Sequence, residues 1–358
     1  MSVATATTIE TVSVGNRGNT AYPNPWGDIG AVDYDYNIGK YEVTAGQYTD
    51  FLNAVAATDT YALYNTSMWT SGFGCKIQRV GDEGSYTYSV APDWANRPVN
   101  LVSWGDAARF ANWLHNGQPT GPQDLTTTED GSYFLNGAMT NAELAAVVRK
   151  PDATWVIPTV HEWFKAAHHK NDGVTGNYFE FPTSTDDMPS NLLSDPDPDP
   201  GNNATFKVGN QWTIGPPYYR TEAGAHENSA SPYGTFDQGG NIYEWTETLV
   251  GSENRGVRGG TFNDTVDLLR ASRPFVGSLP DQNNLLVGFR VALIPGKMAL
   301  PGDLNGDGCV NQSDLGILLS DFGCTGGGCA GDIDGDGDTD QADLGILLSN
   351  FNQGPNCP

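Results

Sequence analysis

The chain has 358 residues with 43 acidic and 18 basic side chains, which gives a formal net charge of −25 and an isoelectric point near 4.2. Such an excess of negative charge argues against nucleic acids and anionic membranes as partners. No apolar run approaches the roughly 20 residues that a membrane-spanning helix requires. The length allows two or three domains, and we expect a large domain over 1–296 and a small one over 297–358.

The large domain is predicted to contain short elements joined by long loops. Thr44 and Thr159 are suited to cap helices, and the apolar spacing predicts helices over 44–56, 106–114 and 160–168. Short strands are expected at 8–14, 36–43, 257–262 and 287–293. Since proline cannot join the interior of a sheet, the alternating Asp and Pro residues of 195–200 predict an exposed, stiff loop. These features indicate an irregular α+β domain.

Six motifs in this region resemble the sulfatase-modifying-factor family, to which the formylglycine-generating enzyme belongs. They occur in the family's order and are Lys40-Tyr-Glu-Val-Thr44, Pro98-Val-Asn-Leu-Val-Ser-Trp104, Ile157-Pro-Thr-Val-His-Glu-Trp163, Gly239-Gly-Asn-Ile-Tyr-Glu-Trp245, Arg258-Gly-Gly-Thr-Phe262 and Gly288-Phe-Arg290. The resemblance implies a C-type-lectin-like α+β fold with little regular secondary structure.

The family's oxidase chemistry is not expected to accompany the fold. In the resembled enzyme two cysteines after the Arg-Gly-Gly element bind copper, and Asp264 and Leu269 stand in their places here. Without a thiolate the soft ligands for Cu(I) are missing. The five histidines (115, 161, 168, 169 and 226) do not show a metal-binding spacing, so we expect them to be core or solvated residues.

One calcium site of the family is expected to persist in the large domain. The resemblance places its ligands at the side chain of Asp237, the carbonyl groups of Gly240 and Ile242, and the carboxylate of Glu244. The alternative is that Glu244 only accepts hydrogen bonds from backbone amides. A second family site is doubtful, because Thr205 replaces the expected asparagine.

Two similar loop-and-helix units follow in the small domain. Each loop has oxygen-bearing side chains at positions 1, 3, 5, 9 and 12 and a glycine at position 6, as a hard cation requires. Position 7 is added to the ligand set, which comprises Asp303, Asn305, Asp307, Cys309, Asn311 and Asp314 in the first loop and Asp332, Asp334, Asp336, Asp338, Asp340 and Asp343 in the second. The duplication predicts two bound calcium ions.

The small domain resembles a type I dockerin over 301–358, because a loop and then a helix are duplicated with Asp at position 12. The resemblance implies a small all-α module that binds calcium and a protein partner. Residues 301–358 contain ten Asp and no Lys or Arg, so we expect the module to need metal for folding. Apolar residues recur at helical spacing and predict one packed stripe per helix, formed by Leu315, Leu318, Leu319 and Phe322 and by Leu344, Leu347, Leu348 and Phe351.

The cysteines indicate an oxidising location outside the cytoplasm. Four of the five lie in the small domain, and among three possible connectivities we favour Cys324–Cys329 and Cys309–Cys357. Cys75 is then a buried thiol or, less favoured, an intermolecular bridge. The first residues contain no basic and apolar leader, so we expect an export signal to have been removed or to lie outside this chain.

Three classes of function remain open from the sequence. The favoured one is a non-catalytic extracellular structural or adhesion protein that assembles through its calcium module and the β-branched segment 3–14, as a self-assembling surface or fibril subunit. The others are a glycan-binding component of a dockerin-tethered secreted complex and a metal-dependent oxidoreductase. Calcium-dependent lectin binding is disfavoured, because Gln118-Pro119-Thr120 lacks the necessary carboxylate.

Overall fold

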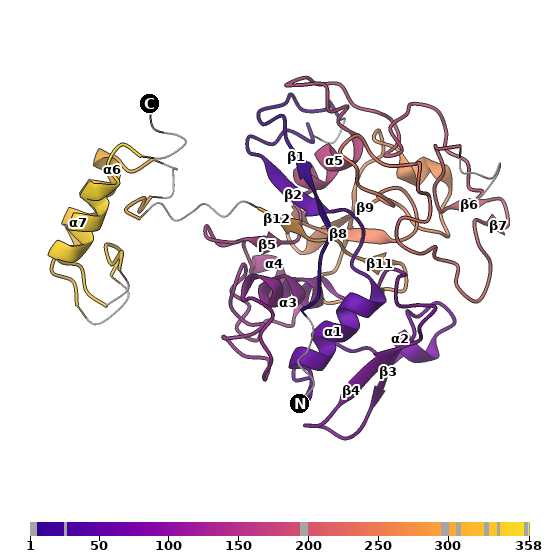
Figure 1. Ribbon diagram of the computed structural model, residues 1–358, viewed down its shortest axis with the longest axis horizontal. Coiled ribbons are helices and arrows are strands. Elements are labelled where there is room, and N and C mark those ends of the chain that lie inside the picture. Colours follow the sequence, from indigo (N-terminus) through magenta and orange to yellow (C-terminus); the bar gives the residue numbers. More distant parts are fainter. Residues whose placement is uncertain are drawn as a thin grey trace. The chain divides into compact units, whose positions relative to one another are not determined.

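The computed structural model describes residues 6–24, 27–193, 200–294, 301–305, 309–325, 329–334, 337–353 and 357. The chain divides into two compact units, one formed by Met1–Lys150 and Thr154–Ile294 and the other by Pro151–Ala153 and Pro295–Pro358. The larger unit consists of short helices and strands joined by long loops (Figure 1). Most of the loop expected at 195–200 lies outside the described residues.

The three predicted helices are present in the larger unit. They are α1 (Ala45–Val55), α3 (Trp104–His115) and α5 (Val160–His168), and the short helices α2 (Ser67–Thr70), α4 (Asn141–Ala146) and η1 (Val266–Leu269) accompany them. Thr44 and Thr159 cap α1 and α5 as predicted, each in a capping box with the side chain three residues later. The helix α3 begins two residues earlier than expected, because Ser103 caps it.

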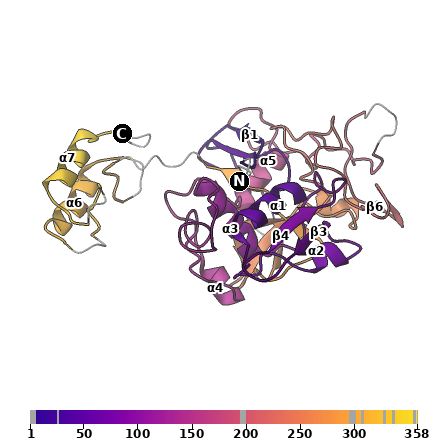
Figure 2. The same ribbon diagram turned by 60° about the horizontal axis from the view of Figure 1, so that its bottom comes forward.

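Two four-stranded sheets and two hairpins complete the larger unit. One sheet has the order β1-β2-β12-β5, formed by Thr11–Val14, Tyr36–Gly39, Ala292–Leu293 and Trp155–Val156. The other has the order β10-β9-β8-β11, formed by Val276–Ser278, Asn254–Arg258, Tyr243–Val250 and Val287–Gly288. The hairpins pair β3 (Ile77–Val80) with β4 (Thr87–Val90) and β6 (Lys207–Val208) with β7 (Gln211–Trp212). Helix α1 packs against the β3–β4 hairpin through strand β4 (Figure 2).

Two strand predictions require correction. The segment 257–262 is not one strand, because β9 ends at Arg258 and the chain then turns through Gly259 and Gly260 at positive φ. The segment 287–293 divides into β11 and β12, which belong to different sheets. Between these two strands lies the buried Arg290, whose partners are described below.

The N-terminal segment is fixed to the larger unit at Thr7. Its amide donates to Gln118 Oε1 at 2.7 Å, and its hydroxyl donates to Asp50 Oδ2 at 2.7 Å. The sequence had suggested no position for residues 1–7. Residues 1–5 lie outside the described part of the chain, whereas Thr7 is buried.

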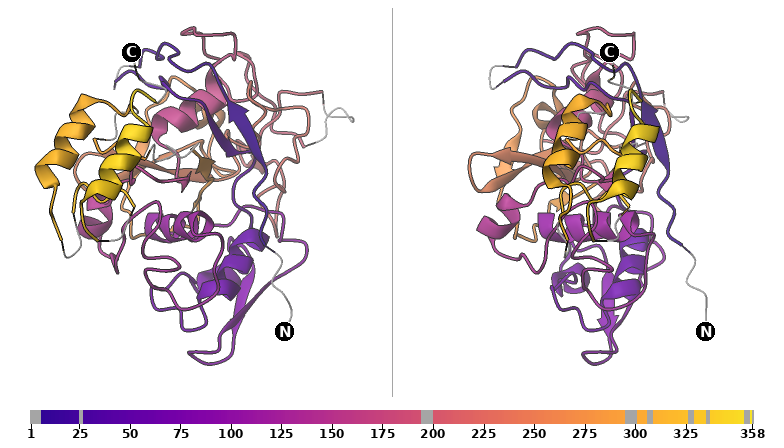
Figure 3. Two further views of the ribbon diagram at one scale, coloured as in Figure 1. Left: turned by 60° about the vertical axis from the view of Figure 1, so that its left-hand side comes forward. Right: turned by 90° about the vertical axis from the view of Figure 1, so that its left-hand side faces the viewer.

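The smaller unit contains two helices, α6 (Gln312–Asp321) and α7 (Gln341–Ser349), which lie side by side (Figure 3). Its core is formed by Val310, Leu318 and Leu347, with Leu315, Leu344 and Phe351 packed against them. The predicted apolar stripes are therefore only partly buried. Leu319 and Leu348 remain 54% and 53% exposed, and Phe322 is 44% exposed.

The cysteines of the smaller unit form the two favoured disulfides, Cys309–Cys357 and Cys324–Cys329. Cys75 is free and buried in the larger unit, in agreement with the favoured prediction of a buried thiol. Among the described residues, no helix combines the length and the apolar character needed to cross a membrane.

Candidate metal centres

Carboxylates gather in the second loop of the smaller unit. Ligand atoms of Asp332, Asp334 and Asp343 lie within 4.8 Å of one another, and those of Asp338, Asp340 and Asp343 do the same. Asp336, the expected ligand at position 5, lies outside the described residues. Asp343 belongs to both groups and is buried at the first turn of α7. The arrangement supplies the hard oxygen atoms that calcium prefers.

Backbone amides fix the last carboxylate of each loop. Asp343 accepts hydrogen bonds from the amides of Ile333 at 2.6 Å and Asp340 at 2.8 Å. In the first loop, Asp314 accepts from the amides of Asn305 at 3.0 Å and Asn311 at 2.9 Å. These bonds join the beginning of each loop to the helix that follows it, so the position of each buried carboxylate is set before any ion binds.

The ninth residue of each loop has a second structural role. Asn311 and Asp340 are the N-caps of α6 and α7, and each accepts a hydrogen bond from an amide two residues later. The other expected ligands of the first loop, Asp303 and Cys309, are described, whereas Asp307 is not. In the second loop, carboxylates that the sequence selected by their spacing lie close together, and calcium binding by either loop stays a prediction.

The expected calcium site of the larger unit is arranged differently from the prediction. Glu244 is fully buried in β8, and both of its oxygen atoms are engaged. Arg290 Nε donates to Oε2 at 2.5 Å, Arg290 Nη2 donates to Oε1 at 2.7 Å, and Trp163 Nε1 donates to Oε2 at 2.7 Å. In this structure Glu244 is the counter-ion of Arg290 and not the open carboxylate that the prediction required.

The remaining predicted ligands lie in the turn that leads into β8. Asp237 has a left-handed φ of 61° and accepts a hydrogen bond from the amide of Gly224 at 2.7 Å. At Gly240 an added Cβ would lie 2.1 Å from the carbonyl oxygen of Thr205, so only glycine fits this close approach. Ile242 is fully buried. The turn is thus tightly packed at the expected position.

A carboxylate that the sequence analysis did not select lies in this region. Glu42 is only 1% exposed, and neither of its carboxylate oxygens has a hydrogen-bond partner. Burial raises the pKa of Glu42 well above its usual range, and the negative charges of Asp237 and Glu244 raise it further. Burial also raises the pKa of Asp237 to about 6. The motif Lys40–Thr44 contained this residue, but nothing in the motif indicated its partners.

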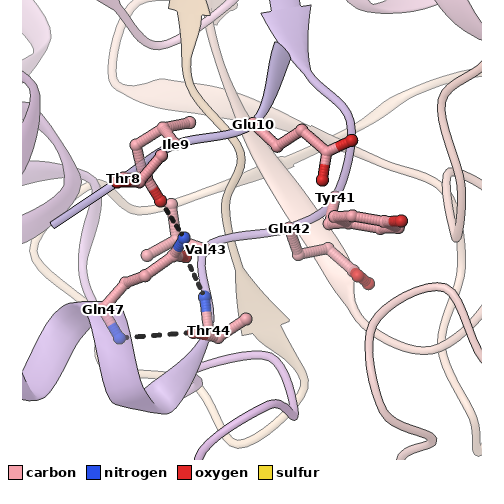
Figure 4. Close-up of a pocket in the computed structure, with 8 residues that line it drawn as sticks. All are labelled: Thr8, Ile9, Glu10, Tyr41, Glu42, Val43, Thr44 and Gln47. Carbon is pink, nitrogen blue, oxygen red and sulfur yellow. Dashed lines mark hydrogen bonds between the residues drawn. The ribbon is translucent and has the colours of Figure 1, made fainter. Parts of the chain in front are cut away.

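Glu42 lines a cavity of about 230 Å³ between the N-terminal segment and the start of α1. In Figure 4, Thr44 and Gln47 bond to each other at this cavity, whereas no bond reaches the Glu42 carboxylate. The surrounding cluster contains Glu42, Asp237 and Glu244; Arg290 pairs with Glu244, and the buried Arg220 also interacts electrostatically with Glu42. With all three carboxylates ionised, they outnumber the guanidiniums of Arg290 and Arg220 by one, and an excess buried charge is costly without a further cation. Among the described residues, these three carboxylates are not one of the groups whose ligand atoms lie within 4.8 Å of one another, so the structure shows an excess of buried negative charge here and not a preformed set of three ligands.

Asp264 and Leu269, which stand where the family has its copper-binding cysteines, have different surroundings from each other. Leu269 is 2% exposed and packs in an apolar cluster with Phe181, Ala204 and Phe206. Asp264 accepts a hydrogen bond from the hydroxyl of Thr261 at 2.9 Å. Among the described residues, no group of three metal-ligating side chains includes a histidine. His168, for example, is buried and bonds through Nδ1 to the carbonyl oxygen of Phe179 at 3.1 Å.

These features define an irregular α+β protein whose fold is of the formylglycine-generating-enzyme type. Residues 11–294 match the model of the sulfatase-modifying factor enzyme 1-like domain, and the chain belongs to this family. The family resemblance seen in the sequence is thereby confirmed for the larger unit. No curated protein matches the chain significantly.

Several solved structures are similar to the larger part of the chain. The structure of CarF has 20% sequence identity and a TM-score of 0.48 and covers 80% of this chain and 98% of its own. Treponema denticola variable protein 1 has 16% identity and a TM-score of 0.46, with 80% and 95% covered. PvdO from Pseudomonas aeruginosa has 14% identity and a TM-score of 0.42, with 80% and 92% covered.

Proposed function

We propose that this chain is a non-catalytic structural or adhesion protein that works outside the cell. In this proposal the larger unit is a rigid body, and the smaller unit is a dockerin-like module that binds a protein partner or a second copy of the chain. The segment 3–14 contributes a further contact. Two disulfides in the smaller unit support an oxidising, extracellular location.

The exposed apolar side chains of the smaller unit carry this proposal. Leu319 of α6 and Leu348 of α7 occupy equivalent positions in the two repeats, and each is more than half exposed. Three residues before each leucine stands a glycine, Gly316 or Gly345, at which an added Cβ would contact nothing within 4 Å. The two helices thus offer the same flat, apolar surface twice. A monomeric protein gains nothing from exposing it, whereas a docking partner would cover it.

Calcium is proposed at three places. Two ions would occupy the loops of the smaller unit, where carboxylates already gather within 4.8 Å in the second loop. One would occupy the larger unit beside Glu42 and Asp237, with Glu42 in place of the predicted Glu244. The supporting observation is that both oxygen atoms of Glu42 are buried without hydrogen-bond partners.

The absence of catalysis is also part of the proposal. In the family the copper thiolates would stand at Asp264 and Leu269, and the side chain of Leu269 is enclosed by apolar residues. A hydrocarbon side chain cannot coordinate a metal, and its packing leaves no donor atom in its place. A second candidate, glycan binding within a tethered secreted complex, is favoured by a polar groove described in the next subsection.

The mass of the purified protein in solution tests the proposed assembly. We expect light scattering to show oligomers or polymers in calcium and smaller species in chelator. Asp303→Ala combined with Asp332→Ala should reduce assembly in calcium, since each replaces the first loop ligand. Glu253→Gln, in an exposed turn of the larger unit, is the matched control. A strict monomer at high concentration in calcium would refute self-assembly and leave a foreign partner.

A further inference from the structure

A groove runs across the loop that follows α1, and none of the candidate metal ligands lines it. It consists of two adjoining hollows of about 480 Å³ and 280 Å³, which share Thr58 and Thr60 as a common wall. The first hollow extends to Arg79, Glu83 and Tyr86 of the β3–β4 hairpin. The second extends to residues 121–123. We call the pair the Thr58 groove; α1 and the hairpin that bound it are visible in Figure 2.

The first hollow is built around a guanidinium that is covered on its faces. Arg79 lies over the ring of Tyr64 at 4.9 Å and over the ring of Tyr86 at 4.3 Å. Its Nη1 donates to Asp59 Oδ2 at 3.2 Å. Because rings cover the guanidinium, it can form further hydrogen bonds only at its edge. Asp59 is itself held by the amide of Leu63 at 2.8 Å, so the polar pair is fixed in place.

The walls of the groove are held together by backbone hydrogen bonds. The carbonyl oxygen of Ala57 accepts from the amides of Gly84 at 2.9 Å and Tyr86 at 3.0 Å, which joins the loop to the hairpin. Gln123 Oε1 accepts from the amide of Tyr61 at 2.8 Å, which joins the loop to the opposite wall. A ligand would therefore meet a surface that is already ordered, and binding would cost little conformational entropy.

We propose that the Thr58 groove binds a neutral oligosaccharide. Sugar hydroxyl groups both donate and accept hydrogen bonds, and the groove offers both kinds of partner. Glu83 accepts, Arg79 donates, and the exposed hydroxyl groups of Thr58 and Thr60 do either, whereas Asp59, whose side chain is 2% exposed, only holds Arg79 in place. In the second hollow, the exposed Ala57 and Pro122 provide apolar surface for the carbon–hydrogen face of a sugar ring.

Charge and size distinguish a neutral sugar from other occupants. The first hollow has two carboxylates and one guanidinium, and the chain as a whole has a net charge of −25, so an acidic sugar or phosphate would be repelled. The hollows have the size typical of small-molecule sites, and their continuity suits two or three linked sugar units. Charged and hydroxyl side chains line the first hollow, and an apolar peptide face would leave them without hydrogen-bond partners.

The test uses the full chain in calcium with four neutral trisaccharides, namely cellotriose, xylotriose, mannotriose and maltotriose, and with trigalacturonic acid as the charged comparison. Binding is measured by calorimetry. We expect at least one neutral trisaccharide to bind and trigalacturonic acid to bind more weakly or not at all. The double variant Thr58→Val with Thr60→Val should weaken binding about tenfold or more, since each lost hydroxyl hydrogen bond reduces affinity several-fold.

Two further variants make the result decisive. Thr60→Trp should fill the space between the two hollows and abolish binding. Thr265→Val should leave binding unchanged, because Thr265 is exposed, lies outside the groove and forms no side-chain cap. The variant Asp303→Ala with Asp332→Ala should keep its affinity, so the result is independent of assembly. Absence of binding by all four neutral sugars, stronger binding of the charged one, or equal loss in Thr265→Val would overturn the proposal.

Discussion

The buried carboxylate of Glu42 allows a quantitative test of a cation in the larger unit. Both of its oxygen atoms are buried without partners, and the three carboxylates of the cluster, when ionised, outnumber the guanidiniums of Arg290 and Arg220. We expect calcium to stabilise the folded unit and Glu42→Gln to remove that effect. At a calcium concentration 100 times the dissociation constant, the gain is about 2.7 kcal/mol. For a domain of this size it corresponds to a rise of about 5 °C in the unfolding temperature.

The variant should behave oppositely in chelator. Without calcium, burial favours the protonated, uncharged form of Glu42, so replacing it with an uncharged amide should leave the unfolding temperature unchanged or raise it. The unfolding temperatures of the two proteins should therefore cross between chelator and calcium. A purely structural role for Glu42 would instead lower the temperature of the variant in both conditions.

Tryptophan fluorescence during heating is the assay, because all nine tryptophans precede residue 246 and the smaller unit contains none. The signal thus follows the larger unit even though calcium also acts on the smaller one. Glu10→Gln is the matched control. Glu10 lines the same cavity, but it is largely exposed and pairs with Lys40 at 2.7 Å. If Glu42→Gln keeps the full calcium shift, or the wild type has none, the reasoning is refuted.

Three other predictions follow from the structure. In excess chelator, limited proteolysis should first cut within 301–358; a first cut within 36–293 would contradict the proposed dependence of the smaller unit on calcium. The chain should take up no stoichiometric Cu(I) and consume no oxygen with a cysteine-containing peptide, and such turnover would refute the non-catalytic proposal. Burial and the charge of Arg258 lower the pKa of His168 to about 3. Only the unfolded chain then takes up this proton as the pH falls below 6.5, so the wild type should lose about 2 kcal/mol from this residue between pH 7 and pH 5. In urea unfolding, the free energy of unfolding of His168→Asn should therefore fall by about 2 kcal/mol less than that of the wild type over the same pH range. If both proteins show the same pH dependence, His168 is not the residue that causes it.

The helices were predictable because their signals are local. Thr44 and Thr159 satisfy amide groups at the start of α1 and α5, and an apolar face follows within the same 10 residues or so. The gathering of carboxylates in the second loop of the smaller unit was predictable for the same reason, since one short segment supplies them. In both cases the interacting residues are neighbours in the sequence.

The strands after residue 286 show where local signals fail. The segment 287–293 has the composition of one strand, yet it divides around Arg290. The guanidinium is buried and needs several acceptors, and it finds them in Glu244 and in the carbonyl groups of Gly39 and Phe236. These partners come from two distant parts of the chain, around residue 39 and over residues 236–244. No pattern within seven residues indicates such a requirement, so the division into two sheets could not be predicted.

The same long-range pairing explains the error about the ligands in the larger unit. Sequence position identified Glu244 as an acidic residue in a glycine-rich turn, but not that Arg290 would occupy it. Once that pair is formed, the charge that remains uncompensated belongs to Glu42 and Asp237. Glu42 lies some 200 residues earlier in the chain, and only the fold brings it near.

The two units should depend on calcium to different degrees. Residues 301–358 contain ten Asp and no basic residue, so no side chain there can replace the ion when it is removed. In the larger unit, Arg290 neutralises Glu244 when the ion is removed. Protonation can neutralise Glu42 and Asp237, because burial raises the pKa of both carboxyl groups. It also keeps a large apolar core around α1 and α3. Chelation should therefore unfold the smaller unit but only lower the stability of the larger one, and proteolysis together with tryptophan fluorescence would distinguish these two responses in one sample.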